Sequence, residues 1–171
     1  ILSLFALAMF SGLGSSCSDC VDPSISVSSS TANSNTVSAS GTVSVTNKID
    51  GDHNYVLMEV ALYKESSDGN SHRIIKGKDV DCVGPLEGDT VTGGKDSASK
   101  SFSISDSPDS YDLQENGDVE VRHIATAYYA SNNGCSGSEV DNRYYWQDIG
   151  QIGGNSAPNA DLSYSPNNPM V

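Results

Sequence analysis

The chain has few basic residues. Lys and Arg account for nine of its 171 residues, against 22 Asp and Glu, so the formal net charge is −13. Proteins that bind nucleic acids or anionic membranes need a cationic patch that displaces counterions. We therefore expect no nucleic-acid partner, and membrane contact only through an apolar leader or a lipid anchor.

Catalytic signatures are also scarce. The three histidines, His53, His72 and His123, are dispersed and form no His-x-x-x-His pair of the kind that holds zinc. Residues 97–100 have the Ser-x-x-Lys spacing of penicillin-binding enzymes, but here the motif precedes a predicted strand instead of lying on a helix. The sequence therefore predicts a protein without enzymatic activity.

The longest apolar run covers residues 1–13 and ends in a polar, serine-rich stretch. It is shorter than the roughly 20 residues of a membrane-spanning helix, but it has the length of the apolar region of a secretory signal. The small residues before Cys17 resemble the lipobox of bacterial lipoproteins, which implies a lipid on Cys17. An ordinary signal peptide cleaved near Ser16 is the alternative. Either origin predicts an extracellular or cell-surface location.

The four cysteines are Cys17, Cys20, Cys82 and Cys135, and they are compatible with an oxidising compartment. Cys82 and Cys135 stand alone in the sequence, whereas a zinc site needs a second closely spaced pair of ligands. Structural disulfides are therefore expected. If Cys17 is acylated, the bridge is Cys82–Cys135 and Cys20 is left over; otherwise the three pairings of four cysteines stay open.

From residue 24 onward the apolar residues recur with a period of two, which is typical of strands with one buried face. In the clearest stretch, residues 37–46, Val, Ala or Gly alternates with Ser or Thr without a break. The pattern predicts seven strands, over residues 24–30, 37–46, 55–64, 72–80, 99–105, 119–130 and 142–149. Turn-forming clusters separate them, so we expect one antiparallel β-sandwich over 21–152, between a leader (1–20) and a Pro- and Asn-rich tail (153–171).

One stretch, Leu113 to Arg122, resembles the corner before strand F in fibronectin type III and related immunoglobulin-like domains. In that family a Leu and a Gly precede an alternating strand, as Leu113 and Gly117 do here. The resemblance implies that the seven strands form an all-β, antiparallel, immunoglobulin-like sandwich. A jelly-roll sandwich is the alternative arrangement.

Oxygen-bearing side chains at alternate positions raise the question of a cation. Asp50, Asp52 and Asn54 surround a Gly turn, and calcium takes roughly six to eight such hard donors. The bidentate Glu that ends an EF-hand loop is missing, so the Asp residues of 106–112 would have to complete the shell. A calcium site is one interpretation, and a solvated Asp-rich turn without a cofactor is the other.

Aromatic residues gather on the two predicted strands that flank Cys135. Tyr and Trp combine a large face with a polar group, so exposed members can stack on sugar rings or anchor a protein. Strand alternation predicts that one of Tyr144 and Tyr145 is buried and the other exposed. The candidate ligand-binding residues are Tyr128, Tyr145 and Trp146, with core filling as their alternative role.

Together these patterns predict an exported, disulfide-containing β-sandwich that acts through surface contacts. The first hypothesis is a structural or adhesive cell-surface protein whose partner is another copy or another surface protein, including a filament subunit assembled by strand complementation. The alternative is a carbohydrate- or calcium-binding module. The first predicts a terminal segment paired with a neighbouring copy, and the second predicts an exposed aromatic platform or converging Asp side chains.

Overall fold

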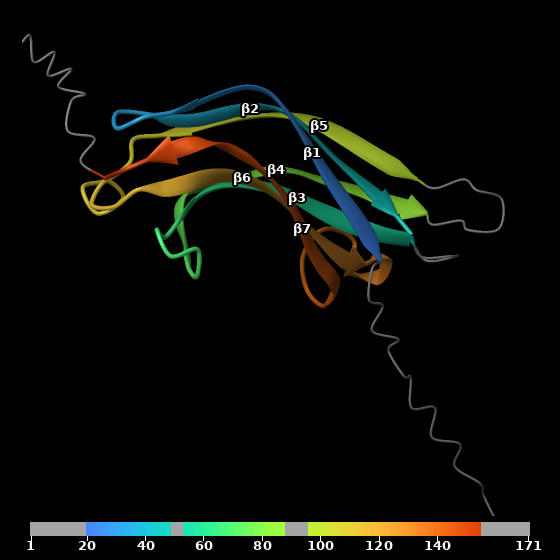
Figure 1. The fold of residues 1–171 in the computed structure, drawn as a ribbon. Coiled ribbons are helices and arrows are strands. Elements are labelled where there is room, and N and C mark those ends of the chain that lie inside the picture. Colours follow the sequence, from blue (N-terminus) through green and yellow to red (C-terminus); the bar gives the residue numbers. More distant parts are fainter. Residues whose placement is uncertain (1–19, 49–52, 88–95, 155–171) are drawn as a thin grey trace, which may run out of the picture.

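Two antiparallel sheets make up the described part of the computed structural model, which covers residues 20–48, 53–87 and 96–154 (Figure 1). The seven strands are β1 (Val21–Ala32), β2 (Val37–Asn47), β3 (His53–Glu65), β4 (His72–Glu87), β5 (Ser97–Asp106), β6 (Gly117–Tyr129) and β7 (Glu139–Ile152). A short 3-10 turn, Ala130–Asn132, follows β6. No helix in these ranges is able to span a membrane. The predicted all-β fold of seven strands is confirmed, and each predicted strand overlaps an observed one.

The strands are divided between a three-stranded sheet, in the order β1-β2-β5, and a four-stranded sheet, in the order β4-β3-β6-β7. Tight hairpins join β1 to β2 and β3 to β4. In the first, Asn33 Oδ1 accepts hydrogen bonds from the amides of Asn35 and Thr36, both at 2.9 Å. The connections after β2, β4 and β5 pass from one sheet to the other. The result is an antiparallel sandwich whose two sheets are stacked face to face (Figure 1).

The core lies between the two sheets because every second residue of each central strand points inward. The inward residues of β2 are Val and Ala, and those of β3 are Val, Met and Leu. The largest fully buried apolar members from these strands and from β6 are Val37, Val43, Val45, Val56, Met58, Val60, Leu62, Val119 and Val121. Removing each such side chain from water contributes about 1.5–3 kcal/mol, so this alternation holds the two layers together.

The close approach of β6 to the end of β3 explains why residue 117 is a glycine. A Cβ atom on Gly117 would collide with the carbonyl oxygen of Glu65, so no larger residue fits where β6 begins beside the end of β3. The preceding connection is held by Arg73, which forms ion pairs with Asp109 and Asp112. These contacts fix the start of β6, whose side chains contribute to the candidate site.

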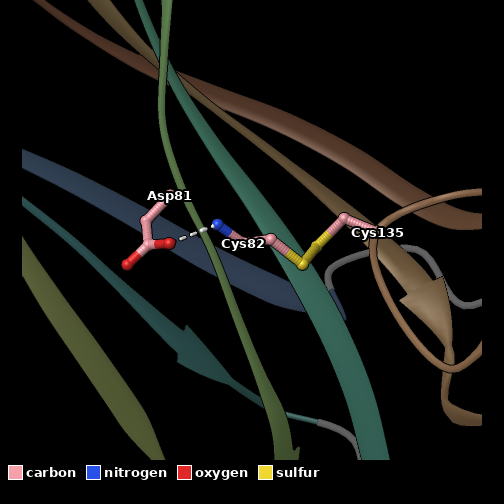
Figure 2. Close-up of a disulfide and its surroundings, with 3 residues drawn as sticks. All are labelled: Asp81, Cys82 and Cys135. Atoms are coloured by element: carbon pink, nitrogen blue, oxygen red, sulfur yellow. Dashed lines mark hydrogen bonds between the residues drawn. A yellow bond between two sulfur atoms is a disulfide. The ribbon is translucent and has the colours of Figure 1, made fainter.

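A disulfide joins Cys82 on β4 to Cys135 in the β6–β7 connection (Figure 2). The two sulfur atoms are 2.07 Å apart, and the Cα atoms are 5.9 Å apart. The expected Cys82–Cys135 bridge is therefore present. Cys20 is disulfide-bonded as well, so it is not left over, as we expected it to be if Cys17 is acylated. Cys17 lies outside the described residues.

Candidate functional site

Large apolar side chains are exposed mainly around the four-stranded sheet. Within the described ranges they are Ile74, Tyr111, Tyr129, Tyr144, Tyr145 and Trp146. All lie on strands of this sheet or in the β5–β6 connection, and three are consecutive in β7. Figure 1 shows the β3–β4 turn (green) and the β6–β7 connection (orange) projecting away from the three-stranded sheet. The outer face of the four-stranded sheet is therefore the first place to look for a binding site.

Arg122, on β6, organises the aromatic residues of this outer face. Its guanidinium carbon lies 4.4 Å from the ring centre of Tyr63 on β3 and 5.2 Å from that of Tyr144 on β7. The guanidinium also donates to Glu120 Oε2, from Nε at 2.9 Å and from Nη2 at 2.8 Å. A guanidinium favours aromatic faces because the ring quadrupole attracts its charge. Arg122 is thus held on three sides.

Trp146 lies at the centre of the exposed aromatic residues of β7. Its ring centre is 5.8 Å from that of Tyr144 and 6.4 Å from that of Tyr145, with tilts of 41° and 40°. The three residues are between 50% and 54% exposed. Together with Tyr63 and Arg122 they form what we call the aromatic cluster.

The prediction that alternation buries one of Tyr144 and Tyr145 is wrong, because β7 is an edge strand. The neighbouring edge of the other sheet, β1, meets β7 through polar side chains. Gln147 Oε1 accepts a hydrogen bond from the amide of Val27 on β1 at 3.4 Å. The middle of β7 therefore exposes side chains on both of its faces.

Tyr128 does not belong to the aromatic cluster. It is only 9% exposed, and burial, followed by the nearby carboxylates of Glu139 and Glu59, raises the pKa of its phenol. It also lies six residues along β6 from Arg122, which is about 20 Å at roughly 3.3 Å per residue. Of the three candidate ligand-binding residues, the structure thus places Tyr145 and Trp146 together and Tyr128 apart.

Two carboxyl groups, Glu59 on β3 and Asp79 on β4, are neighbours on the same outer face. Burial raises the pKa of Glu59, and the charge of Asp79 and a hydrogen bond to it raise that pKa further. Glycosidases hold their two carboxyl groups at least about 5 Å apart. A directly hydrogen-bonded pair does not have that geometry.

Of the predicted calcium ligands, Asn54 is described, whereas Asp50 and Asp52 lie outside the described residues. Asn54 is 2% exposed, and its side-chain nitrogen has no hydrogen-bond partner in the described part of the chain. The calcium interpretation of this turn therefore stays a prediction.

The Asp residues of the β5–β6 connection do not complete a calcium site with Asn54. They lie beside Arg73, whose register partner on β3 is Lys64. Lys64 and Asn54 are ten residues apart along β3, which corresponds to about 33 Å. Arg73 Nη1 donates to Asp109 at 3.0 Å and to Asp112 at 2.8 Å. The guanidinium holds the pKa of Asp109 well below its usual range, so the positive charge of Arg73 already neutralises this Asp cluster.

Sequence reasoning missed the cluster members that come from distant strands. Tyr63 is the direct partner of Glu120, which binds Arg122, in the β3–β6 register, but no local pattern reveals that register. Arg122 gave one usable signal, because a basic residue inside an apolar strand must find partners when it is buried. A second group was also missed: Glu65 and His72 are the pair that closes the β3–β4 hairpin.

Comparisons with known proteins do not assign the chain to a family. No family model and no curated protein matches the chain. Among solved structures, the sporulation control protein Spo0M from Bacillus subtilis is 12% identical, with a TM-score of 0.39, over 79% of this chain and 50% of that one. The Northeast Structural Genomics Consortium target SoR45 is 10% identical, with a TM-score of 0.33, over 75% of this chain and 87% of that one. The chain thus spans half the length of Spo0M, and similarity this low assigns no function.

Proposed function

We propose that the protein is a non-enzymatic, adhesive protein of the cell surface that binds a neutral carbohydrate through its aromatic cluster. The observation that carries the proposal is the exposure of Tyr144 and Trp146, at 54% and 50%, on one face of β7 beside Arg122, with Tyr145 exposed on the opposite face. Contiguous exposed apolar surface on a soluble protein often marks a binding site. Tyr, Trp and Arg are also the residues most enriched at binding hot spots.

The chemistry of the cluster suits a sugar ring. The C–H face of a sugar stacks on an aromatic ring, and its hydroxyl groups need donors and acceptors close by. Trp146 offers an indole N–H, and Tyr144 and Tyr145 offer phenol groups that both donate and accept. The net charge of −13 disfavours an anionic polymer, so we expect a neutral one.

Part of the cluster is also held in place before a ligand arrives. Arg122 is stacked against Tyr63 and Tyr144 and is ion-paired with Glu120. Side chains that are already immobilised lose less conformational entropy on binding. This preorganisation favours a binding role over a merely solvated surface.

An extracellular or cell-surface location is part of the proposal. The Cys82–Cys135 disulfide supports it, because such bonds persist in oxidising compartments. The apolar run over 1–13 supports export.

We also propose an immunoglobulin-like topology. A constant-type immunoglobulin domain has its first, second, fifth and fourth strands in one sheet and its third, sixth and seventh in the other. Here β1, β2 and β5 are consecutive in one sheet, and β3, β6 and β7 are consecutive in the other. The fourth strand, β4, pairs with β3 instead of β5. The strand order thus supports an immunoglobulin-like sandwich with its fourth strand moved to the other sheet.

A second candidate function is head-to-tail assembly into a filament. Its support is that β1 begins and β7 ends at opposite ends of the sandwich (Figure 1). The described strands already enclose the core, so a strand donated by the tail of another copy would extend an open edge, such as that of β5. Electron microscopy of the full chain and of a variant lacking residues 155–171 tests this: filaments from the full chain alone would support it, and a monomer in both would exclude it.

The carbohydrate proposal is tested by glycan binding of the full chain, of Trp146→Ala and of the control Tyr111→Ala. Tyr111 is 61% exposed but lies outside the aromatic cluster. For a neutral polysaccharide retained by the wild type, we expect Trp146→Ala to weaken binding at least about tenfold, or about 1.4 kcal/mol. Tyr111→Ala should bind normally. Failure of the wild type to retain any neutral polysaccharide, or equal losses in both variants, would overturn the proposal.

A further inference from the structure

We infer that Glu65, His72 and Glu120 form a binding site for a divalent transition-metal ion such as Zn²⁺. The inference does not depend on the carbohydrate proposal. Glu65 is the last residue of β3, His72 is the first residue of β4, and Glu120 lies near the start of β6. One ligand atom of each residue lies within 4.8 Å of those of the other two.

The separations between the ligand atoms of this group exceed hydrogen-bond distances and approach the separations between the ligand atoms around a metal ion. His72 Nε2 lies 3.6 Å from Glu120 Oε1 and 4.0 Å from Glu65 Oε1. Hydrogen bonds between such atoms measure about 2.7–3.2 Å. Donor atoms at about 2.1 Å from a tetrahedral Zn²⁺ lie about 3.4 Å from one another. Glu65 and His72 are partly exposed, so small side-chain rotations bring the three atoms to that spacing.

Glu120 is the most deeply buried of the three ligands, at 5% exposed, and a carboxylate this deeply buried normally has partners. Its Oε2 accepts hydrogen bonds from Arg122, while its Oε1 lies at the 3.6 Å from His72 Nε2 given above. Arg122 thus fixes the carboxylate, and a metal ion at the centre of the group would bind Oε1.

The donor set selects the class of metal. An imidazole nitrogen with two carboxylate oxygens suits zinc, copper or nickel, whereas calcium prefers oxygen ligands alone. Arg122 orients Glu120 from outside, as the outer partners of metal ligands commonly do. Three protein ligands leave a coordination position open. A hollow of about 160 Å³ is lined in part by Glu65 and His72, so water or a small ligand can reach these two residues.

Zinc titration of the chelator-treated full chain by calorimetry tests the inference, with His72→Ala and the control His53→Ala. His53 is a matched control because it lies at the opposite end of β3 from Glu65. We expect one Zn²⁺ per chain in the wild type and in His53→Ala, and at least tenfold weaker binding in His72→Ala. Glu65→Gln, a second variant at a partly exposed position, should weaken binding in the same way. Identical titrations of all four proteins, or no zinc uptake by the wild type, would refute the site.

A thermal measurement gives a second readout. An ion that binds the folded chain but not the unfolded one raises the unfolding temperature. Zinc should therefore raise the Tm of the wild type and of His53→Ala, and should leave that of His72→Ala unchanged. An equal rise in all three would mean that zinc binds elsewhere.

Discussion

The two outer faces of the sandwich differ sharply in chemistry although their inner faces are alike. The three-stranded sheet turns small hydroxyl side chains outward, which on β2 are Ser38, Ser40, Thr42, Ser44 and Thr46. The four-stranded sheet presents Tyr, Trp, Arg, His and Glu, several of them joined by stacking and ion pairs. Both sheets bury Val-rich inner faces. The difference therefore lies in the outward residues alone.

This difference separates what the fold needs from what a binding surface needs. Small hydroxyl groups keep a strand solvated, and alternating them with Val is enough to define which face is buried. Large aromatic residues on an exposed edge strand are a liability for aggregation. Their presence on β7, and their absence from the described outer face of β2, supports a binding role for the four-stranded sheet.

The largest effect is expected at the disulfide on the four-stranded side. Replacing Cys82 and Cys135 together by Ser removes a crosslink between residues 53 positions apart. The chain-entropy relation predicts a loss of about 4 kcal/mol in the free energy of unfolding. Urea unfolding without reducing agent measures it. A loss below about 1 kcal/mol would mean that other contacts hold the β6–β7 connection in place.

The next largest effect on stability is expected at His123, in the core between the two sheets. His123 is completely buried; its Nδ1 lies 2.9 Å from the Ser24 carbonyl of β1, and its Nε2 has no hydrogen-bond partner among the described residues. Burial lowers the pKa of His123 from 6.5 to about 4, although the contact with Ser24 opposes this. Between these values the unfolded chain binds more protons than the folded one. The stability from this residue is therefore complete above pH 6.5 and is lost as the pH falls toward 4.

The expected loss from His123 over this interval is about 3 kcal/mol. His123→Leu should flatten the dependence of the unfolding free energy on pH between 6.5 and 4, whatever its effect on absolute stability. Urea unfolding at half-unit pH steps gives the two slopes. Parallel curves for wild type and His123→Leu would contradict the assignment.

A smaller loss is expected from Arg122→Leu on the outer face. The change leaves Glu120 buried without its partner and removes two cation–π contacts, with a combined cost of about 2–3 kcal/mol. The control is Lys100→Leu on β5, because Lys100 and Asp81 form an ion pair that is exposed on both sides. Its removal should leave the unfolding free energy unchanged within error. Similar losses in both variants would show that Arg122 is no better integrated than a surface charge.

The seven strands were predictable because a period of two is a local signal. Residues 37–46 reveal their buried face from composition alone, and the observed strand β2 follows that pattern. The aromatic cluster was only partly predictable. Its β7 members are neighbours in sequence, but Tyr63 and Arg122 meet through a register between distant strands.

The error at Tyr144 and Tyr145 has a different physical origin. Alternation tells which face of a strand a side chain takes, but it does not tell whether the other sheet extends far enough to cover that face. β7 is an edge strand, so its inward-facing Tyr145 remains 52% exposed. Edge position is a property of the strand order, which no single strand encodes.

The smallest effect is expected on the three-stranded sheet. Ser44 Oγ and Ser99 Oγ form an exposed hydrogen bond of 2.7 Å, which water can replace on either partner. Ser44→Ala should therefore change the free energy of unfolding by less than about 0.5 kcal/mol and leave glycan and zinc binding intact. Urea unfolding and the two binding assays check this. If Ser44→Ala weakened glycan binding as much as Trp146→Ala, the hydroxyl face would itself be part of the binding surface, and the division of roles between the two sheets would fail.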